Sequence, residues 1–70
     1  MEDSVYKIIE LVGTSNKSWE DATNNAVIQA AKTLRGLRIA EIVEQDAIIK
    51  DGKITAFRSK VKLSFKFGSG

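Results

Sequence analysis

Residues 53–67 alternate between apolar and polar side chains, and this pattern constrains the fold more than any other feature of the chain. One alternate set is largely apolar and consists of Phe57, Ser59, Val61, Leu63, Phe65 and Phe67. The other set is largely basic and consists of Arg58, Lys60, Lys62, Ser64 and Lys66. A period of two residues is typical of a strand with one buried face. We therefore expect a strand over residues 53–67 with one apolar and one basic face.

The dipeptide Asp51-Gly52 directly precedes this strand and is a strong signal for a two-residue hairpin turn. Residues 37–50 would then form an antiparallel partner strand of about equal length. Glu44 and Asp46 share one face of that partner strand, so they would lie beside the basic set described above. Opposite charges directly across two strands contribute roughly 0.2–1 kcal/mol per pair. The pattern therefore predicts cross-strand salt bridges between the two strands.

The first half of the chain predicts a strand, a loop and a helix. Residues 5–12 are rich in β-branched side chains, and Gly13 is expected to turn the chain into a loop over residues 13–16. Ser18 is placed to cap a helix, with Asp21 three residues later. Lys32 and Arg35 would lie in its last turn, followed by Gly36 as the stop. The apolar stripe of this helix is Ala22, Ala26, Ala30 and Leu34, flanked by Val27 and Ala31.

These elements predict an α+β fold of β-α-β-β order, in which a three-stranded antiparallel sheet wraps around one helix. We expect a single domain over residues 1–67, with residues 68–70 as a flexible tail or an added linker. Two strands of about 14 residues would be nearly twice as long as a helix of about 17 residues. Part of the apolar sheet would then have no cover from its own chain. We interpret this part as an assembly surface.

Composition favours support of the fold by oligomerisation or by a cation with oxygen ligands. A 70-residue chain buries only about 60% of its unfolded surface, and such chains usually need a disulfide, a metal or a partner. Cysteine and histidine are absent, which excludes disulfides and the usual zinc sites, and removes the commonest catalytic bases and nucleophiles. We expect a non-enzymatic, cytoplasmic protein. With a net charge of +2 and mixed charges, it is expected to bind neither nucleic acid nor membrane.

Five segments, taken in order, resemble the dodecin family. They are VYKIIELVGTS, SWEDA, AAKTLRGLRIAEIVEQD, DGKI and KVKLSFKF. The resemblance runs from about residue 5 to residue 67, which is nearly the whole chain. The resemblance implies a β-α-β-β protomer and a hollow homododecamer with 23 symmetry. For many members it also implies storage of a flavin, riboflavin or FMN, without turnover.

The resemblance also identifies three ligand-contact positions, and this chain departs from the flavin-binding pattern at each. Ile39 stands where a tryptophan stacks on the flavin, Arg58 stands in place of a glutamine, and Asp46 stands in place of a basic residue. The sequence is more similar to a branch that lacks this tryptophan and includes a calcium-binding dodecin. Two functions therefore stay open. One is flavin storage at Ile39, Asp46 and Arg58; the other is a calcium- or magnesium-binding scaffold that uses Glu44 and Asp46.

The single tryptophan, Trp19, lies at the expected helix start rather than at the stacking position. We interpret it as a residue that packs on the sheet or on a neighbouring subunit, rather than as a stacking platform for a flavin. The basic strand face is interpreted as a source of salt bridges rather than as an anion-binding surface, because no aromatic residue is interleaved in it.

Overall fold

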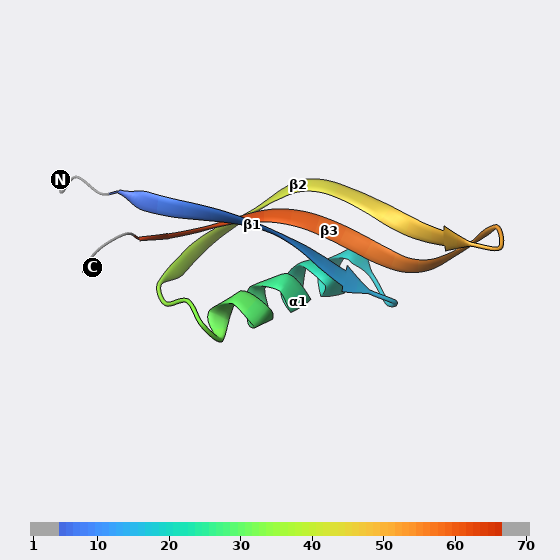
Figure 1. Cartoon of the computed structure of the whole chain (residues 1–70), viewed down its shortest axis with the longest axis horizontal. Coiled ribbons are helices and arrows are strands. Elements are labelled where there is room, and N and C mark those ends of the chain that lie inside the picture. The colour runs from blue at the N-terminus through green and yellow to red at the C-terminus, as the bar shows by residue number, and fades with distance from the viewer. Residues whose placement is uncertain (1–4, 67–70) are drawn as a thin grey trace.

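The computed structural model describes residues 5–66, which form one helix and three strands (Figure 1). In chain order these are β1 (Tyr6–Ser15), α1 (Trp19–Ala31), β2 (Leu37–Lys50) and β3 (Lys53–Lys66). The strands form one antiparallel sheet in the order β1-β3-β2, so the last strand is central. The predicted α+β fold of β-α-β-β order is confirmed. Phe67 and the expected tail at residues 68–70 lie outside the described residues.

The hairpin between β2 and β3 closes at Asp51-Gly52, as predicted. Lys50 lies opposite Lys53, and the two turn residues have φ angles of 53° and 75°. Positive φ at both positions is the requirement of a type I′ turn, and glycine meets it without steric cost.

The register of this hairpin shifts by one residue between Ile48 and Ile49. Counting back from the turn without this shift would place Asp46 opposite Phe57. With the shift, Asp46 lies opposite Arg58 instead. A β-bulge of this kind re-aims the side chains beyond it, because successive side chains of a strand point to opposite faces.

The prediction of a loop at residues 13–16 was wrong, because β1 continues through Gly13 to Ser15. Gly13 lies opposite Ser59 of the central strand and is buried beneath α1. A Cβ atom at this position would lie 2.0 Å from the carbonyl oxygen of Ala22. The glycine therefore lets the helix approach the strand closely, and it does not turn the chain.

The start of α1 was predicted correctly and its end was not. The Ser18 hydroxyl accepts a 3.0 Å hydrogen bond from the backbone N–H of Asp21. The helix has 13 residues and ends at Ala31, so Lys32 is the C-cap residue and Arg35 lies beyond the helix. The chain leaves the helix early, and Leu34 packs against the buried core from outside it.

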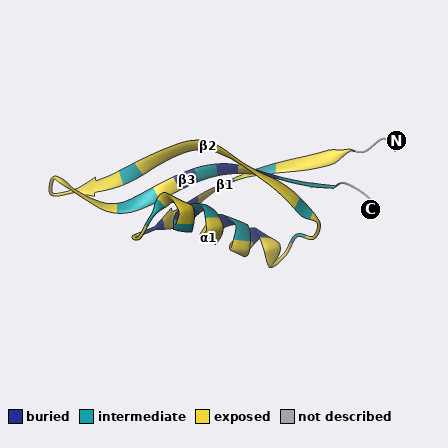
Figure 2. Cartoon of the chain, turned by 180° about the vertical axis from the view of Figure 1, so that it is seen from behind, coloured by how far each residue is buried: buried dark blue, intermediate teal, exposed yellow. Residues whose placement is uncertain are grey.

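The core lies between the alanine stripe of α1 and the central strand (Figure 2). Ala22, Ala26 and Ala30 are buried, and across from them Val61 and Leu63 are almost fully enclosed. The molecule measures 53 × 20 × 14 Å, and the hairpin end of the sheet extends past the helix (Figure 1). The predicted uncovered length of sheet is therefore present, and Ile48, Ile49 and Ile54 are exposed there.

Candidate functional site

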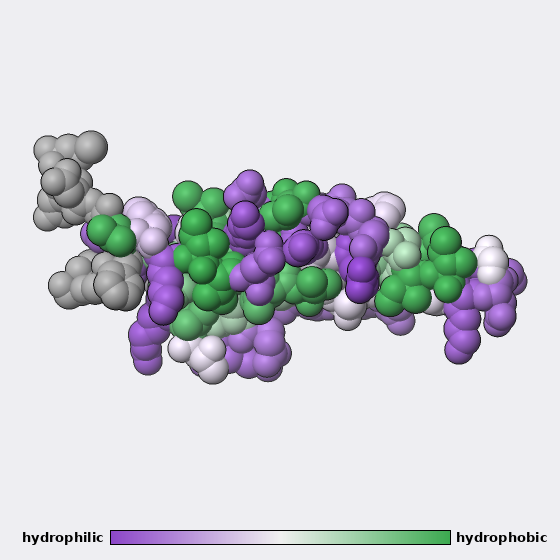
Figure 3. Space-filling view, turned by 45° about the horizontal axis from the view of Figure 1, so that its top comes forward, coloured by the Kyte–Doolittle hydropathy of each residue, from purple (hydrophilic) through white to green (hydrophobic). Residues whose placement is uncertain are grey.

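The sheet face turned away from α1, here called the open face, carries charged side chains in rows across the strands. Residues opposite one another in a ladder share a face, so the strand register defines these rows. The rows are Glu10, Lys62 and Glu41; Val12, Lys60 and Glu44; and Thr14, Arg58 and Asp46. The acidic residues lie mainly on β2 and the basic ones on β3. Figure 3 shows hydrophilic side chains interspersed with apolar ones, and a further apolar group towards the hairpin end.

The tightest pair on the open face joins Asp46 and Arg58. The guanidinium Nε donates to Oδ1 and Nη2 donates to Oδ2, each over 2.7 Å. Both side chains are about half exposed, at 54% for Asp46 and 46% for Arg58. The hydrogen bonds from Arg58 lower the pKa of Asp46, and the same bonds raise the pKa of Arg58. Both groups are therefore held in their charged forms at neutral pH.

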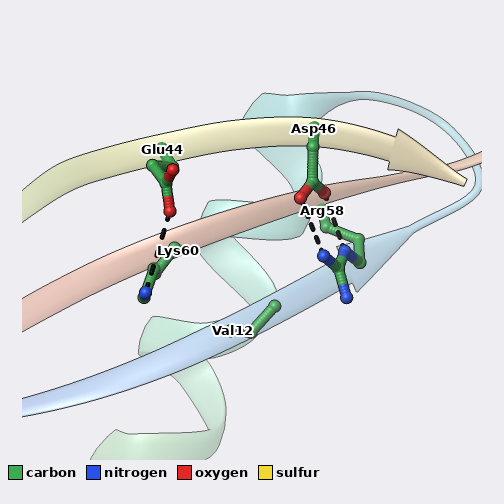
Figure 4. A pocket seen from close by; sticks show the side chains of 5 residues that line it. All are labelled: Val12, Glu44, Asp46, Arg58 and Lys60. Atoms are coloured by element: carbon green, nitrogen blue, oxygen red, sulfur yellow. Dashed lines mark hydrogen bonds and ion pairs between the residues drawn. The ribbon is translucent and has the colours of Figure 1, made fainter.

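A second pair lies next to the first. Lys60 Nζ is 3.7 Å from a carboxylate oxygen of Glu44; the Lys60 side chain is partly buried and the Glu44 side chain is exposed. Together with Val12, the two pairs line a small cavity of about 120 Å³, here called the open-face cavity (Figure 4). In the close view, each acidic side chain of β2 points towards its basic partner on β3. The predicted cross-strand salt bridges are confirmed for these two pairs.

The two residues expected to bind a cation, Glu44 and Asp46, are both committed to these basic partners. Within residues 5–66 of one chain, no group of three or more acidic side chains lies together that could hold a metal ion. Calcium takes six to eight oxygen ligands.

Ile39 lies far from Asp46 on the same strand. It pairs with Ser64 and is 61% exposed. The two positions are seven residues apart along the strand, which corresponds to roughly 23 Å. Ile39 borders a shallow depression of about 150 Å³ whose other lining residues are Val27, Leu37, Arg38, Ala40 and Leu63. The structure therefore brings Asp46 and Arg58 together and places Ile39 apart from them.

Trp19 packs on the sheet, as expected. Its ring lies edge-on to Phe57 with ring centroids 4.8 Å apart. The indole Nε1 donates a 2.9 Å hydrogen bond to the backbone carbonyl of Asp46. Asp46 is thus held by its backbone from the helix and by its carboxylate from Arg58. Sequence reasoning missed this link, because no local pattern joins residues 27 positions apart.

Another contact that the sequence did not reveal lies in the core. Ser59 is completely buried, and its hydroxyl lies 2.7 Å from the hydroxyl of Thr23. Thr23 in turn donates to the carbonyl of Trp19 over 3.0 Å. The pair satisfies a buried polar group and fixes α1 on the central strand, which is a structural role.

Fold and site together define a small α+β protein whose sheet is longer than the helix α1 and whose open face carries cross-strand ion pairs. In the described part of the chain, no helix is long and apolar enough to cross a membrane. The chain belongs to the dodecin family, whose model matches residues 5–68. This confirms the resemblance found in the sequence.

Two relatives illustrate the range of the family. The chain is 47% identical to the calcium dodecin of Mycobacterium tuberculosis over 64 residues, which cover 90% of this chain and 89% of that protein. It is 36% identical to the dodecin of Thermus thermophilus over 62 residues, covering 89% and 90% of the two chains. Both relatives are named as dodecins rather than as enzymes.

Solved structures show the same fold. Dodecin from Streptomyces coelicolor superposes with a TM-score of 0.92 at 33% identity, and the match covers 100% of both chains. The calcium dodecin of Mycobacterium tuberculosis, described with a novel calcium-binding site, superposes with a TM-score of 0.81 at 41% identity, covering 96% of both chains.

Proposed function

We propose that the chain is the protomer of a closed homododecamer with 23 symmetry that sequesters a small ligand and performs no catalysis. The observation that carries this proposal is the length of sheet that α1 leaves uncovered. A compact chain of 70 residues would have a radius of gyration of about 11 Å. The observed value is 14.4 Å. Such a shape is costly for a monomer and suits a subunit.

The exposed surface supports assembly in the same way. The chain exposes 5400 Å², whereas a compact monomer of its mass would expose about 4,300 Å². A stable interface buries about 800 Å² on each partner. Much of the exposed side-chain surface on the hairpin strands is apolar, contributed by Ile39, Ile42, Val43, Ile48, Ile49 and Ile54. Burial of these side chains between copies is the driving force that we propose for the shell.

The proposed ligand is a flavin, riboflavin or FMN, bound between subunits. Ile39, Asp46 and Arg58 are the positions that the family resemblance assigns to flavin contacts. Because Ile39 lies roughly 23 Å from Asp46 within one chain, a single flavin can meet all three only if two copies contribute. Ile39 offers apolar contact without ring stacking, and stacking adds about 0.5–1.5 kcal/mol per aromatic pair. Binding is therefore expected to be weaker than at a tryptophan-lined site.

Riboflavin titration tests this function. Purified protein at increasing concentration is added to a fixed amount of riboflavin, and bound flavin is separated by equilibrium dialysis. We expect saturable binding that Ile39→Asp abolishes, because a carboxylate would replace the apolar contact. Ile39→Leu, which keeps an apolar side chain, is the matched control and should keep binding. Both variants are compared with the native protein at the parent assembly size. Unsaturable binding, or equal binding by Ile39→Asp, would contradict flavin storage.

A second candidate function is calcium binding by the assembled shell, with magnesium as a weaker competitor. It is favoured by the 47% identity to a protein named calcium dodecin. Glu44 and Asp46 are the residues that we propose as ligands, gathered from several copies by symmetry. Thermal melting with calcium and with a chelator tests this candidate. Calcium should raise the melting temperature of the native chain and leave that of Glu44→Gln unchanged. Equal melting with and without the chelator would contradict it.

We also propose that residues 1–67 act as one domain and that the protein works in the cytoplasm. The absence of cysteine is in keeping with a reducing compartment, because no disulfide is needed for the fold.

A further inference from the structure

The open-face cavity has a charge arrangement that bears on which ligands it accepts. Its lining holds two basic side chains, Arg58 and Lys60, and two acidic ones, Asp46 and Glu44. Each basic group lies against one acidic group, at 2.7 Å and 3.7 Å respectively. The formal charges of the lining therefore cancel.

Arg58 would be a strong anion-binding group if it were free. A guanidinium binds phosphate and carboxylate through two parallel N–H donors, and this geometry is the reason arginine predominates in phosphate sites. Here Nε and Nη2 both donate to Asp46. The donors of Nη1 and the second donor of Nη2 are not used by Asp46. A phosphate bound by them would still lie beside the Asp46 carboxylate, whose negative charge repels it.

Asp46 is also fixed in place. Its backbone carbonyl accepts the 2.9 Å hydrogen bond from Trp19 Nε1. The residues before and after it in β2, Gln45 and Ala47, both pair with β3. The backbone therefore holds the carboxylate near the cavity even when the side chain is displaced from Arg58. The negative charge would stay close to any bound anion.

We propose that Asp46 is a specificity-determining residue that excludes phosphate-bearing ligands from the open-face cavity by pairing with Arg58 and compensating its positive charge. If the proposed flavin function holds, the native protein then prefers riboflavin, which carries no phosphate, to FMN, which carries one. This second statement rests on the proposed function. The exclusion itself does not, because it concerns the cavity and can be measured with an inorganic anion.

The test compares pyrophosphate binding by the native protein, Asp46→Asn and Glu41→Gln, using calorimetry at neutral pH and low salt. Glu41→Gln is a matched control, because it removes one negative charge from the same face of the same strand but does not line the cavity. We expect Asp46→Asn to bind pyrophosphate at least about tenfold more tightly than the other two proteins, since hydrogen bonds to charged groups are the strong ones. Equal affinity in all three proteins would overturn the proposal.

A second variant guards against misfolding of the first. If Asp46→Asn loses the parent assembly size, Asp46→Ser is used, which also removes the carboxylate from Arg58; no gain over Glu41→Gln would overturn the proposal. The flavin measurement is separate. The ratio of FMN to riboflavin affinity should rise about tenfold in Asp46→Asn. If the native protein binds neither flavin, the proposed function fails, and the pyrophosphate comparison still decides whether Asp46 excludes anions.

Discussion

Substitution of Gly13 by alanine tests the close approach of α1 to β1. The new Cβ would lie 2.0 Å from the carbonyl oxygen of Ala22 and 3.0 Å from the Cβ of Ala26, whereas ordinary contact begins at 3.4 Å. The nearest obstacle is backbone, so no side chain can rotate away and the helix itself must shift. Overpacking of this kind costs about 1–3 kcal/mol.

The sign of the effect is informative. At a strand position without an obstacle, replacing glycine by alanine would stabilise the protein by about 0.4–1 kcal/mol through the unfolded state. We expect the opposite sign, because helix displacement also loosens the buried alanine stripe. For a domain of this size, 1 kcal/mol corresponds to roughly 4–8 °C in melting temperature. Gly13→Ala should therefore melt about 5–20 °C below the native protein.

The assay is thermal unfolding followed by Trp19 fluorescence at one protomer concentration, because the stability of an oligomer depends on concentration. Thr14→Ala is the control, since Thr14 is the exposed neighbour on the same strand. This control should change stability by less than about 1 kcal/mol. A Gly13→Ala protein as stable as the native one would refute the close approach.

Three further predictions address assembly, acid sensitivity and the helix anchor. Ile49→Asp changes a side chain that is 68% exposed in the protomer, so it should leave the protomer folded and reduce assembly, as measured by gel filtration and circular dichroism. The hydrogen bonds from Arg58 lower the pKa of Asp46 from its ordinary value of 3.8. The pair therefore stabilises the fold above pH 3.8, and this stabilisation is lost as the pH falls through the lowered pKa. The free energy of unfolding of the native protein, measured with urea, should exceed that of Asp46→Asn by less in acid than at neutral pH. Trp19→Phe keeps an aromatic ring beside Phe57 but loses the bond to the Asp46 carbonyl, and should lower the free energy of unfolding by about 0.5–1.5 kcal/mol.

The β2–β3 hairpin was predictable because its signals are local. Asp51-Gly52 specifies the turn, and the alternation along β3 specifies which side chains face the core. Ser18 likewise revealed the helix start, because a cap is defined by the residues next to it.

The errors concern positions whose role depends on distant parts of the chain. Gly13 follows an apolar run, and a glycine there is equally consistent with a turn and with a strand beneath a helix. Only the position of Ala22 distinguishes the two. The end of α1 was misplaced for a similar reason. The residues Lys32, Arg35 and Gly36 are typical of a helix that ends near residue 35. The helix instead ends at Ala31, and Leu34 packs on the core from beyond it.

The candidate site was predictable only in part. Salt bridges between the acidic and the basic strand followed from their opposite charges. The pairing of Asp46 with Arg58 depends on the register shift at Ile48 and Ile49, and the sequence carries no clear signal for that bulge. The hydrogen bond from Trp19 to Asp46 depends on where the helix docks, so it also required the structure.

Native mass spectrometry of the purified protein tests whether this chain is a subunit of a closed shell. A protomer of 7.7 kDa in a closed assembly of twelve copies predicts one dominant species of about 92 kDa that resists dilution. A dominant species at the mass of a single protomer, at micromolar concentration and near-neutral pH, would contradict the account.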